Sequence, residues 1–284
     1  MKWISFDGGR VGYIEGEEVV DVTPQFSSTS ETWPPVNMLR VAAAGGKGRS
    51  ADVTRLPLSS VRLECPIQWP NKVIAFPANY RDHIEEMKQG LVSKFSADGQ
   101  GFFLKAGSSL SGPADPIVIP AIPGREVHHE SELAVIIGGG GRYISREKAF
   151  EAIFGYSCLI DVVVRGKEER VMRKSFDGFC PVGPHIVTAD EVADVQNLTI
   201  SLKVNGQMRQ HANTRDFIVD IPGMIEMASS VMTLFPGDII ASGTPAGVGP
   251  LSDGDLVEMS IEEVGSLCLR VRADNHAPHA VWKK

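Results

Sequence analysis

Two glutamates placed two residues apart, Glu130 and Glu132, constrain this chain more than any other feature. The apolar run Leu133–Ile137 follows directly, and it predicts a buried strand. Side chains at positions i and i+2 of a strand project from the same face, so we expect the two carboxylates side by side. Adjacent like charges repel, and each would be neutralised unless something compensates them. A cation is the simplest compensation.

Asp161 supplies a third carboxylate from a second β-rich run, Cys158–Val164, in which its neighbours are apolar. A lone carboxylate in a buried strand is costly unless it is paired or bound to a metal. Hard oxygen donors suit magnesium, manganese or calcium better than zinc. The sequence therefore predicts a divalent-cation site on Glu130, Glu132 and Asp161.

Two other hypotheses for this stretch stay open. A Glu-Xaa-Glu pattern is also typical of a solvated strand face that binds nothing. His128 and Glu130 could instead belong to an iron or zinc site of two histidines and one carboxylate, with His185 completing it. Nothing in the sequence places His185 near the other two residues.

The bulk properties exclude several classes of protein. The 284 residues suffice for one large domain, or for a large domain with a small partner. A net charge of -7 disfavours nonspecific binding to nucleic acids or anionic membranes, because both need a basic face. No apolar run approaches the length of a membrane span, and the N-terminus lacks the pattern of a signal peptide. The four cysteines form no Cys-Xaa-Xaa-Cys pair, so we expect a reduced, cytoplasmic protein.

Residues 1–64 are expected to form a small β-rich N-terminal domain, followed by a catalytic domain over residues 65–284. Two alternating segments flank Asp7–Arg10 and predict a hairpin, and Glu18–Val22 is a predicted third strand. A short helix is predicted over Asn37–Ala44, because two glycines follow it. No residue of this segment suggests chemistry, so we expect a structural or dimer-supporting role.

A candidate general base lies on a predicted helix. His83 and Glu86 are three residues apart, so they share a helical face and can touch. A carboxylate beside an imidazole raises its basicity and fixes its orientation, as a general base requires. An isolated pair with this spacing is also typical of a solvated helix surface.

Local patterns predict a hairpin and two helices in the rest of the chain. The dipeptide Asn205-Gly206 joins the predicted strand Leu198–Val204 to a partner strand, which is a strong hairpin signal. An amphipathic helix capped by Ser145 is predicted to reach Phe154. Another helix is predicted over Ile225–Leu234.

Two glycine-bearing segments are similar in composition to ligand-binding loops. The loop Gly243–Gly249 carries one hydroxyl, Thr244, and such loops bring backbone N–H groups and a side-chain oxygen close to a ligand. Many loops of this composition are only turns. Gly138–Gly141 is not followed by the helix-opening Gly-Lys-Ser pattern of a phosphate cradle, so we expect a flexible turn.

Taken in order, these motifs closely resemble the fumarylacetoacetate hydrolase family, from about Pro66 to Val271. Each motif is modest alone, but the ordered set is highly specific. The motifs are Asn79-Tyr80-Xaa-Xaa-His83-Xaa-Xaa-Glu86, Phe103-Xaa-Lys105 with Ser108-Ser109-Leu110, Glu130-Xaa-Glu132-Leu133-Ala134-Val135, Asp161 with Arg165, Lys174-Ser175-Phe176-Asp177, Val204-Asn205-Gly206 with Gln210, and Pro236-Gly237-Asp238 with Gly243–Gly249.

The resemblance implies a fold that is mainly β with α (α+β), with a mixed β-roll catalytic domain that is usually a homodimer. It implies one magnesium or manganese ion on the three carboxylates, with Lys174 beside it. His83 and Glu86 would form a water-activating pair on a lid. Family substrates are 2-oxo or 2,4-dioxo carboxylates that chelate the metal through neighbouring oxygens.

Further positions match family residues that contact substrate or stabilise an enolate. These residues are Tyr80, Lys105, Arg165, Gln210 and Thr244. The resulting hypothesis is a metal-dependent hydrolase that cleaves a carbon–carbon bond in an acylpyruvate-like acid, in the catabolism of aromatic compounds or sugar acids. The alternatives are a decarboxylase, hydratase or isomerase acting through a metal-bound enolate, and a catalytically inert metal- or ligand-binding homologue. The His83–Glu86 pair argues against the inert homologue, which has no need of a base.

The chain departs from the family pattern in two places. Ala78 replaces a glycine that is common near the lid entrance, and Glu168 stands where members commonly have a substrate-facing glutamine. Glu168 is expected to pair with Arg165, because opposite charges at close range favour the ionised forms. The alternatives are a protonated Glu168, one turned away from the site, and a solvated loop residue. A paired Arg165 would be less available to a second carboxylate, which predicts a preference for monocarboxylic dioxo acids.

Overall fold

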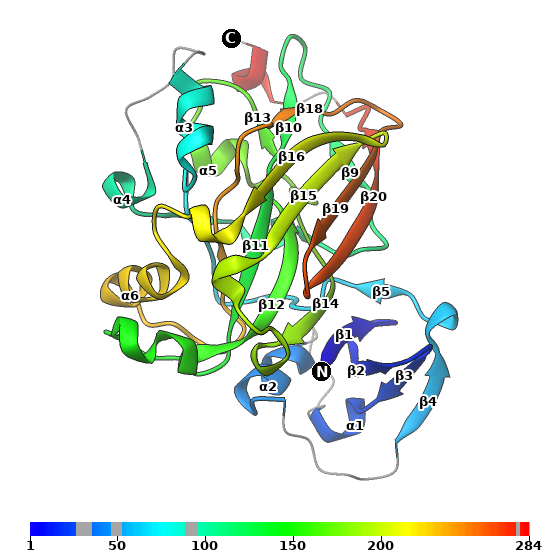
Figure 1. Ribbon diagram of the computed structural model, residues 1–284. Coiled ribbons are helices and arrows are strands. Elements are labelled where there is room, and N and C mark those ends of the chain that lie inside the picture. The colour runs from blue at the N-terminus through cyan, green and yellow to red at the C-terminus, as the bar shows by residue number, and fades with distance from the viewer. Residues whose placement is uncertain (27–35, 47–52, 89–95, 277–278, 284) are drawn as a thin grey trace.

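The computed structural model describes residues 1–26, 36–46, 53–88, 96–276 and 279–283 (Figure 1). The fold is mixed α+β and mostly strand, which is the predicted class. The strands form one large sheet and two smaller sheets. None of the helices in these ranges is long and apolar enough to cross a membrane.

The largest sheet has twelve strands and continues from the N-terminal strands into the centre of the molecule. Its main path runs in the order β4 (Thr54–Pro57), β3 (Glu18–Asp21), β2 (Arg10–Glu15), β1 (Lys2–Phe6), β14 (Cys180–Thr188), β12 (Ile153–Ile160), β11 (Ser131–Ile137), β17 (Ile239–Ala241), β6 (Val73–Ala75) and β7 (Phe103–Lys105). Two short strands join it at the side, β5 (Leu63–Glu64) on β1 and β8 (Leu110–Ser111) on β14. Every residue of β11 and β12 is buried, which explains why both strands carry long apolar runs instead of alternating apolar and polar residues.

The N-terminal strands are built into this sheet. β1 pairs antiparallel with β14, and Trp3 lies opposite Ile186. Trp3 is 2% exposed, and it belongs to the same apolar cluster as Ile136 and Leu159 of the central strands. The N-terminal segment therefore shares both a sheet and a core with the rest of the chain.

The two smaller sheets lie above the N-terminal strands in the view of Figure 1. One has the order β16 (Gln207–Asn213), β15 (Thr199–Val204), β19 (Leu256–Ile261), β20 (Gly265–Ala273) and β9 (Ile117–Ile119), and the other has the order β13 (Val163–Val164), β10 (Val127–His129) and β18 (Gly249–Pro250). The predicted hairpin is confirmed. Asn205 and Gly206 join β15 to β16 with φ angles of 53° and 75°, as a two-residue hairpin turn requires.

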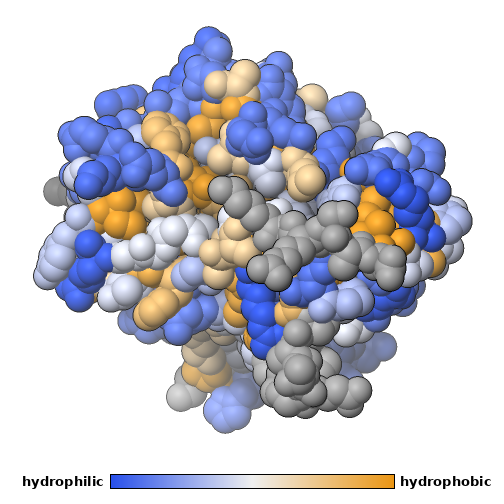
Figure 2. All heavy atoms as spheres, turned by 90° about the horizontal axis from the view of Figure 1, so that it is seen from below, coloured by the Kyte–Doolittle hydropathy of each residue, from blue (hydrophilic) through white to orange (hydrophobic). Residues whose placement is uncertain are grey.

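The helices are short. The α-helices are α1 (Thr23–Phe26), α2 (Asn37–Ala43), α3 (Arg81–Lys88), α4 (Ala97–Gln100), α5 (Arg170–Arg173) and α6 (Ile221–Val231). The 3-10 helices are η1 (Leu58–Ser60), η2 (Gly107–Ser109), η3 (Arg146–Ala152), η4 (Ala189–Glu191), η5 (Val195–Asn197), η6 (Thr214–Asp216) and η7 (Ala280–Lys283). The face in Figure 2 is largely hydrophilic, with its apolar residues in separate patches.

Two of the predicted helices differ from the observed elements. Residues 146–152 form the 3-10 helix η3 instead of an α-helix, the Ser145 side chain makes no capping hydrogen bond, and the chain then enters β12. Helix α6 begins at Ile221, before the predicted start. The reason is that the Asp220 side chain accepts a hydrogen bond from the Gly223 N–H, and a proline fits the first turn.

A buried ion pair fixes the start of β17 against β6. Asp238 is 0% exposed, and it accepts hydrogen bonds from Lys72 Nζ at 2.5 Å and from the backbone N–H groups of Lys72 and Phe235. We expect Lys72→Met to lower the free energy of unfolding by about 3–5 kcal/mol, because it leaves a buried carboxylate without its cation. Chemical denaturation measures this loss. Lys203→Met, at an exposed position of β15, should change it by less than about 0.5 kcal/mol, and equal losses in the two variants would contradict this role of the pair.

Candidate active site

Three buried carboxylates meet at the floor of a cavity. Glu130 lies between β10 and β11, Glu132 lies in β11, and Asp161 follows the last residue of β12. The Asp161 N–H donates to the Glu130 carbonyl at 2.8 Å, which ties the two segments together. One carboxylate oxygen from each residue lies within 4.8 Å of the others. The residues are 6%, 2% and 1% exposed, so the hypothesis of a solvated strand face is wrong.

The predicted single strand over Cys158–Val164 is broken at Asp161. β12 ends one residue before Asp161, and β13 begins two residues after it. At the break, the Val162 N–H donates to the Phe179 carbonyl at 3.0 Å instead of continuing the ladder with β11. Asp161 therefore projects from an interruption between two strands.

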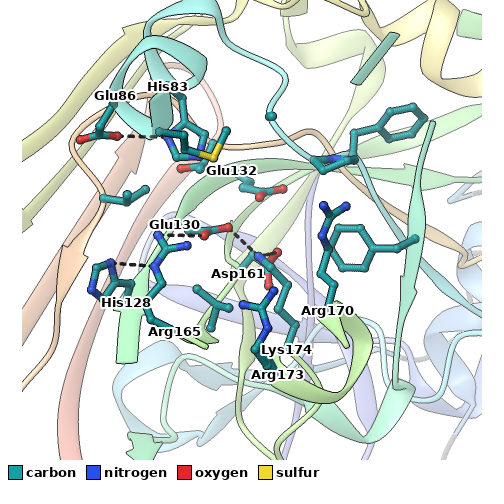
Figure 3. A pocket seen from close by; sticks show the side chains of 18 of the residues that line it. His83, Glu86, His128, Glu130, Glu132, Asp161, Arg165, Arg170, Arg173 and Lys174 are labelled. Carbon is teal, nitrogen blue, oxygen red and sulfur yellow. Dashed lines mark hydrogen bonds and ion pairs between the residues drawn. The ribbon is translucent and has the colours of Figure 1, made fainter. Parts of the chain in front are cut away.

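Two buried lysines contact the triad of Glu130, Glu132 and Asp161, and Figure 3 shows one of them, Lys174. Lys174 Nζ lies 2.6 Å from a Glu130 oxygen and 2.5 Å from an Asp161 oxygen. Lys105 Nζ donates to the other Asp161 oxygen and, at 3.0 Å, to the Phe179 carbonyl. Lys105 therefore holds the Asp161 carboxylate in position.

The triad is electrostatically asymmetric. Burial raises the pKa of Glu130, but Lys174 and Arg165 more than offset this and lower it to about 2. Burial and the neighbouring Asp161 carboxylate raise the pKa of Glu132 well above its usual range. Glu132 accepts a hydrogen bond from the Gly243 N–H at 2.8 Å and, within the described ranges, has no direct cationic partner. Among the three adjacent carboxylates, Glu132 is therefore the one whose ionised form is most disfavoured.

The triad fits a divalent cation. Lys105, Lys174 and Arg165 pair with Glu130 and Asp161, which leaves Glu132 as the carboxylate of the triad without a direct cationic partner among the described residues. A divalent ion would supply the positive charge that Glu132 lacks. Its ligands would be the hard carboxylate oxygens that such ions prefer. Across the part of the chain that the structure describes, this is the single group of three or more potential ligands so close together.

The predicted base pair faces the same cavity from α3. His83 Nδ1 lies 3.1 Å from Glu86 Oε2, and both residues line the cavity (Figure 3). Burial raises the pKa of Glu86, but hydrogen bonds from His83 and from the Gly247 N–H more than offset this and lower it. An ionised Glu86 holds the imidazole proton on Nδ1, which leaves Nε2 unprotonated. His83 can therefore accept a proton through Nε2.

Gly247 positions Glu86. Its N–H lies 3.1 Å and 3.3 Å from the two Glu86 oxygens. Its φ is +95°, and a Cβ added there would lie 1.9 Å from the Arg209 carbonyl oxygen. We therefore expect Gly247→Ala to displace the loop and to lower turnover by about 100-fold, with divalent-metal binding retained. Steady-state kinetics and metal titration measure the two effects.

The matched control for this variant is Gly254→Ala. Gly254 also has a positive φ, of +85°, but an added Cβ would meet nothing within 4 Å. Gly254→Ala therefore shares the backbone strain without the collision and without the contact to Glu86. If both variants lose turnover equally, backbone strain accounts for the loss and Gly247 has no special role.

Arg165 reaches the triad from the end of β13. Its Nε donates to His128 Nδ1 at 3.0 Å, and one of its terminal nitrogens lies 3.5 Å from a Glu130 oxygen. His128 Nε2 lies 2.8 Å from Glu126, so both ring nitrogens of His128 are engaged. His185 lies on β14 and is outside the triad. This geometry leaves no basis for the iron or zinc site of two histidines.

The expected pairing of Glu168 with Arg165 is wrong. Glu168 pairs instead with Arg125, at 2.8 Å between Oε1 and one terminal nitrogen and 3.2 Å between Oε2 and the other. Arg125 also donates to the Arg165 carbonyl at 3.2 Å. The sequence pattern could not reveal this partner, because Arg125 lies 43 positions earlier in the chain. The predicted preference for monocarboxylic acids loses its basis.

The cavity has a volume of about 710 Å³ and brings together most of the predicted site residues. Those that line it are His83, Glu86, Glu130, Glu132, Asp161, Arg165, Lys174 and Thr244. Tyr80, Lys105 and Gln210 do not line it. Tyr80 is 2% exposed and packs edge-on against Phe217, and Gln210 is 0% exposed and donates to Thr244 Oγ1 at 2.7 Å. In this structure Gln210 therefore orients Thr244.

Sequence reasoning missed several residues of the cavity wall. Arg170 and Arg173 on α5 both line it, together with Phe103 and Gln100. The spacing of Arg170, Arg173 and Lys174 places all three on one helical face, and that signal was available in the sequence.

The chain matches known proteins over most of its length. Residues 72–272 match the family model described as fumarylacetoacetate (FAA) hydrolase C-terminal. The maleylpyruvate hydrolase of Aquipseudomonas alcaligenes is 39% identical over an alignment of 287 residues. The alignment covers 96% of this chain and 100% of that protein.

Solved structures agree with this match. The crystal structure of maleylpyruvate hydrolase from Sphingobium sp. SYK-6 in complex with manganese(II) ion and pyruvate has 48% identity and a TM-score of 0.84, and it covers 97% of this chain and 100% of that one. A structure described as 2-hydroxyhepta-2,4-diene-1,7-dioate isomerase from Mycobacterium marinum has 32% identity and a TM-score of 0.77, with the same coverage.

Proposed function

The chain belongs to the fumarylacetoacetate hydrolase family, and we propose that it is a divalent-metal-dependent enzyme that hydrolyses an acylpyruvate. The observation that carries this proposal is that the carboxylate triad and the His83–Glu86 pair open onto one cavity. The two similar proteins described as maleylpyruvate hydrolases support the substrate class. Water and an acylpyruvate give pyruvate and the acid of the acyl group, with cleavage of the bond between the acyl carbon and the pyruvate methylene.

Glu130, Glu132 and Asp161 would hold the ion, which we propose to be magnesium or manganese. A bound divalent ion supplies Lewis-acid polarisation of the substrate carbonyl and offsets charge that develops on the departing pyruvate. Lys174 contacts both Glu130 and Asp161, so it fixes the two carboxylates relative to each other. Arg165 lies beside the triad and offers N–H donors to the carboxylate of the 2-oxo acid.

His83 is the proposed base. Its Nε2 takes a proton from a water molecule, and the hydroxide equivalent attacks the acyl carbonyl. Glu86 stabilises the imidazolium through Nδ1–H and prevents the ring from rotating. When the carbon–carbon bond breaks, the imidazolium can return its proton to the methylene carbon of the departing enolate. Thr244, held by Gln210, offers a hydroxyl at the cavity wall.

Keto–enol isomerisation is the second candidate function. It is favoured by the similarity to the isomerase structure, and it needs proton transfer by His83 without attack by water. The two activities differ in their products. Hydrolysis of acetylpyruvate by the manganese-loaded protein should release pyruvate and acetate in equal amounts. Loss of the enol absorbance without any pyruvate would establish isomerisation instead.

We also propose that the protein is a homodimer that acts in the catabolism of aromatic compounds or sugar acids. The support for both statements is the family resemblance. Light scattering during gel filtration tests the first, and a monomeric mass would contradict it.

A further inference from the structure

Arg170 is an arginine of the cavity wall that the proposed mechanism does not use. It is the first residue of α5, and Figure 3 shows it across the triad from Arg165, away from His83 and Glu86. The two arginines therefore flank the carboxylates from opposite sides. A ligand held at the triad and by Arg165 would extend toward Arg170.

The contacts of Arg170 leave most of its donors available. Its guanidinium carbon lies 5.2 Å from the centre of the Phe103 ring, and one terminal nitrogen donates to Gln100 Oε1 at 3.1 Å. Among the residues that the structure describes, no carboxylate pairs directly with it. Burial lowers its pKa, because the charge is partly desolvated, and the charges of Glu130, Asp161 and Glu169 only partly offset this.

Two other arginines near the cavity have different hydrogen-bond partners. Arg173 donates to the backbone carbonyls of Glu168 at 2.8 Å and Val164 at 3.2 Å. Arg125 pairs with Glu168. Arg170 thus combines partial burial, a position on the cavity wall and the lack of a direct acidic partner within the described ranges.

We propose that Arg170 binds a second carboxylate at the distal end of the substrate, so that the enzyme prefers dicarboxylic acylpyruvates. The planar guanidinium offers two parallel N–H donors that match a carboxylate, and Phe103 supports one of its faces. The inference rests on the proposed function, because the triad and Arg165 must hold the 2-oxo acid end. It reverses the substrate preference that the sequence had suggested.

The test compares succinylpyruvate, which has a distal carboxylate, with acetylpyruvate, which has none. In Arg170→Gln, the ratio of kcat/KM for succinylpyruvate to kcat/KM for acetylpyruvate should fall by about 30-fold or more. The control is Lys167→Gln, which removes a positive charge at an exposed position close to α5 that does not line the cavity. In that variant the ratio should change by less than about threefold. If Lys167→Gln lowers the ratio as far as Arg170→Gln does, a general loss of positive charge explains the effect and the proposal is wrong.

A binding measurement separates this inference from the proposed function. Calorimetric titration of manganese-loaded His83→Ala with the two acylpyruvates needs no turnover. Adding Arg170→Gln should weaken the binding of succinylpyruvate about 30-fold more than that of acetylpyruvate. If the unmutated enzyme releases no pyruvate but this difference is found, the proposed hydrolysis fails and the role of Arg170 stands. Equal weakening for both ligands overturns the role of Arg170.

Discussion

Glu132→Gln is expected to abolish divalent-metal binding and turnover while leaving the metal-free fold intact. The amide has the shape of the carboxylate, and its oxygen can still accept the hydrogen bond from the Gly243 N–H. The variant loses one of three anionic donors, and hard divalent ions depend on such charge. It also removes repulsion between Glu132 and Asp161, so the metal-free variant should be at least as stable as the metal-free unmutated protein.

Thermal unfolding and kinetics test this expectation together. Manganese at about 100 times its Kd stabilises the native state by about 2.7 kcal/mol, so the Tm of the unmutated protein should rise by about 5 °C or more. The Tm of Glu132→Gln should not rise, and its turnover should fall about 1,000-fold or more, because the metal supplies several kcal/mol to the transition state.

Glu126→Gln makes the same chemical change outside the triad, at a glutamate whose side chain is 65% exposed, and it should keep the manganese-induced shift. A full shift in Glu132→Gln would remove this residue from the metal site.

His83→Ala is expected to lower turnover by about two to four orders of magnitude, which is the usual effect of losing a general base. Metal affinity should change by less than about threefold, because His83 lies outside the triad that would bind the ion. Glu86→Gln should lower turnover less, because an amide stabilises the imidazolium less than a carboxylate does.

Asp82→Asn is the matched control, since Asp82 lies next to His83 on α3 but is exposed. It should retain turnover within about threefold. Full pyruvate release by His83→Ala would exclude water activation by this residue. Full isomerisation without pyruvate release in His83→Ala would instead separate the two candidate activities.

The sequence predicted those parts of the site that depend on local spacing. Glu130 and Glu132 share a strand face because side chains repeat every two residues along a strand. His83 and Glu86 touch because positions three apart are neighbours on a helix. The hairpin at Asn205 followed from turn chemistry. These geometries are fixed by the backbone of one element.

The features that the sequence did not predict depend on long-range contacts. The break at Asp161 needs hydrogen bonds from two other segments, and Glu168 finds Arg125 instead of Arg165 because of how distant loops pack. Tyr80 and Gln210 belong to motifs of the family, yet tertiary packing places both outside the cavity lining. A motif specifies which residues are present, whereas the fold decides which of them face the ligand.

A manganese titration of chelator-stripped protein tests the central claim most directly, with bound metal and pyruvate release from an acylpyruvate measured in the same samples. The triad provides one site per chain. Pyruvate release should be absent from the stripped protein, should rise in proportion to bound metal, and should saturate at one ion per chain. Full pyruvate release by the stripped protein, or release that is unrelated to metal occupancy, would contradict the assignment of this site.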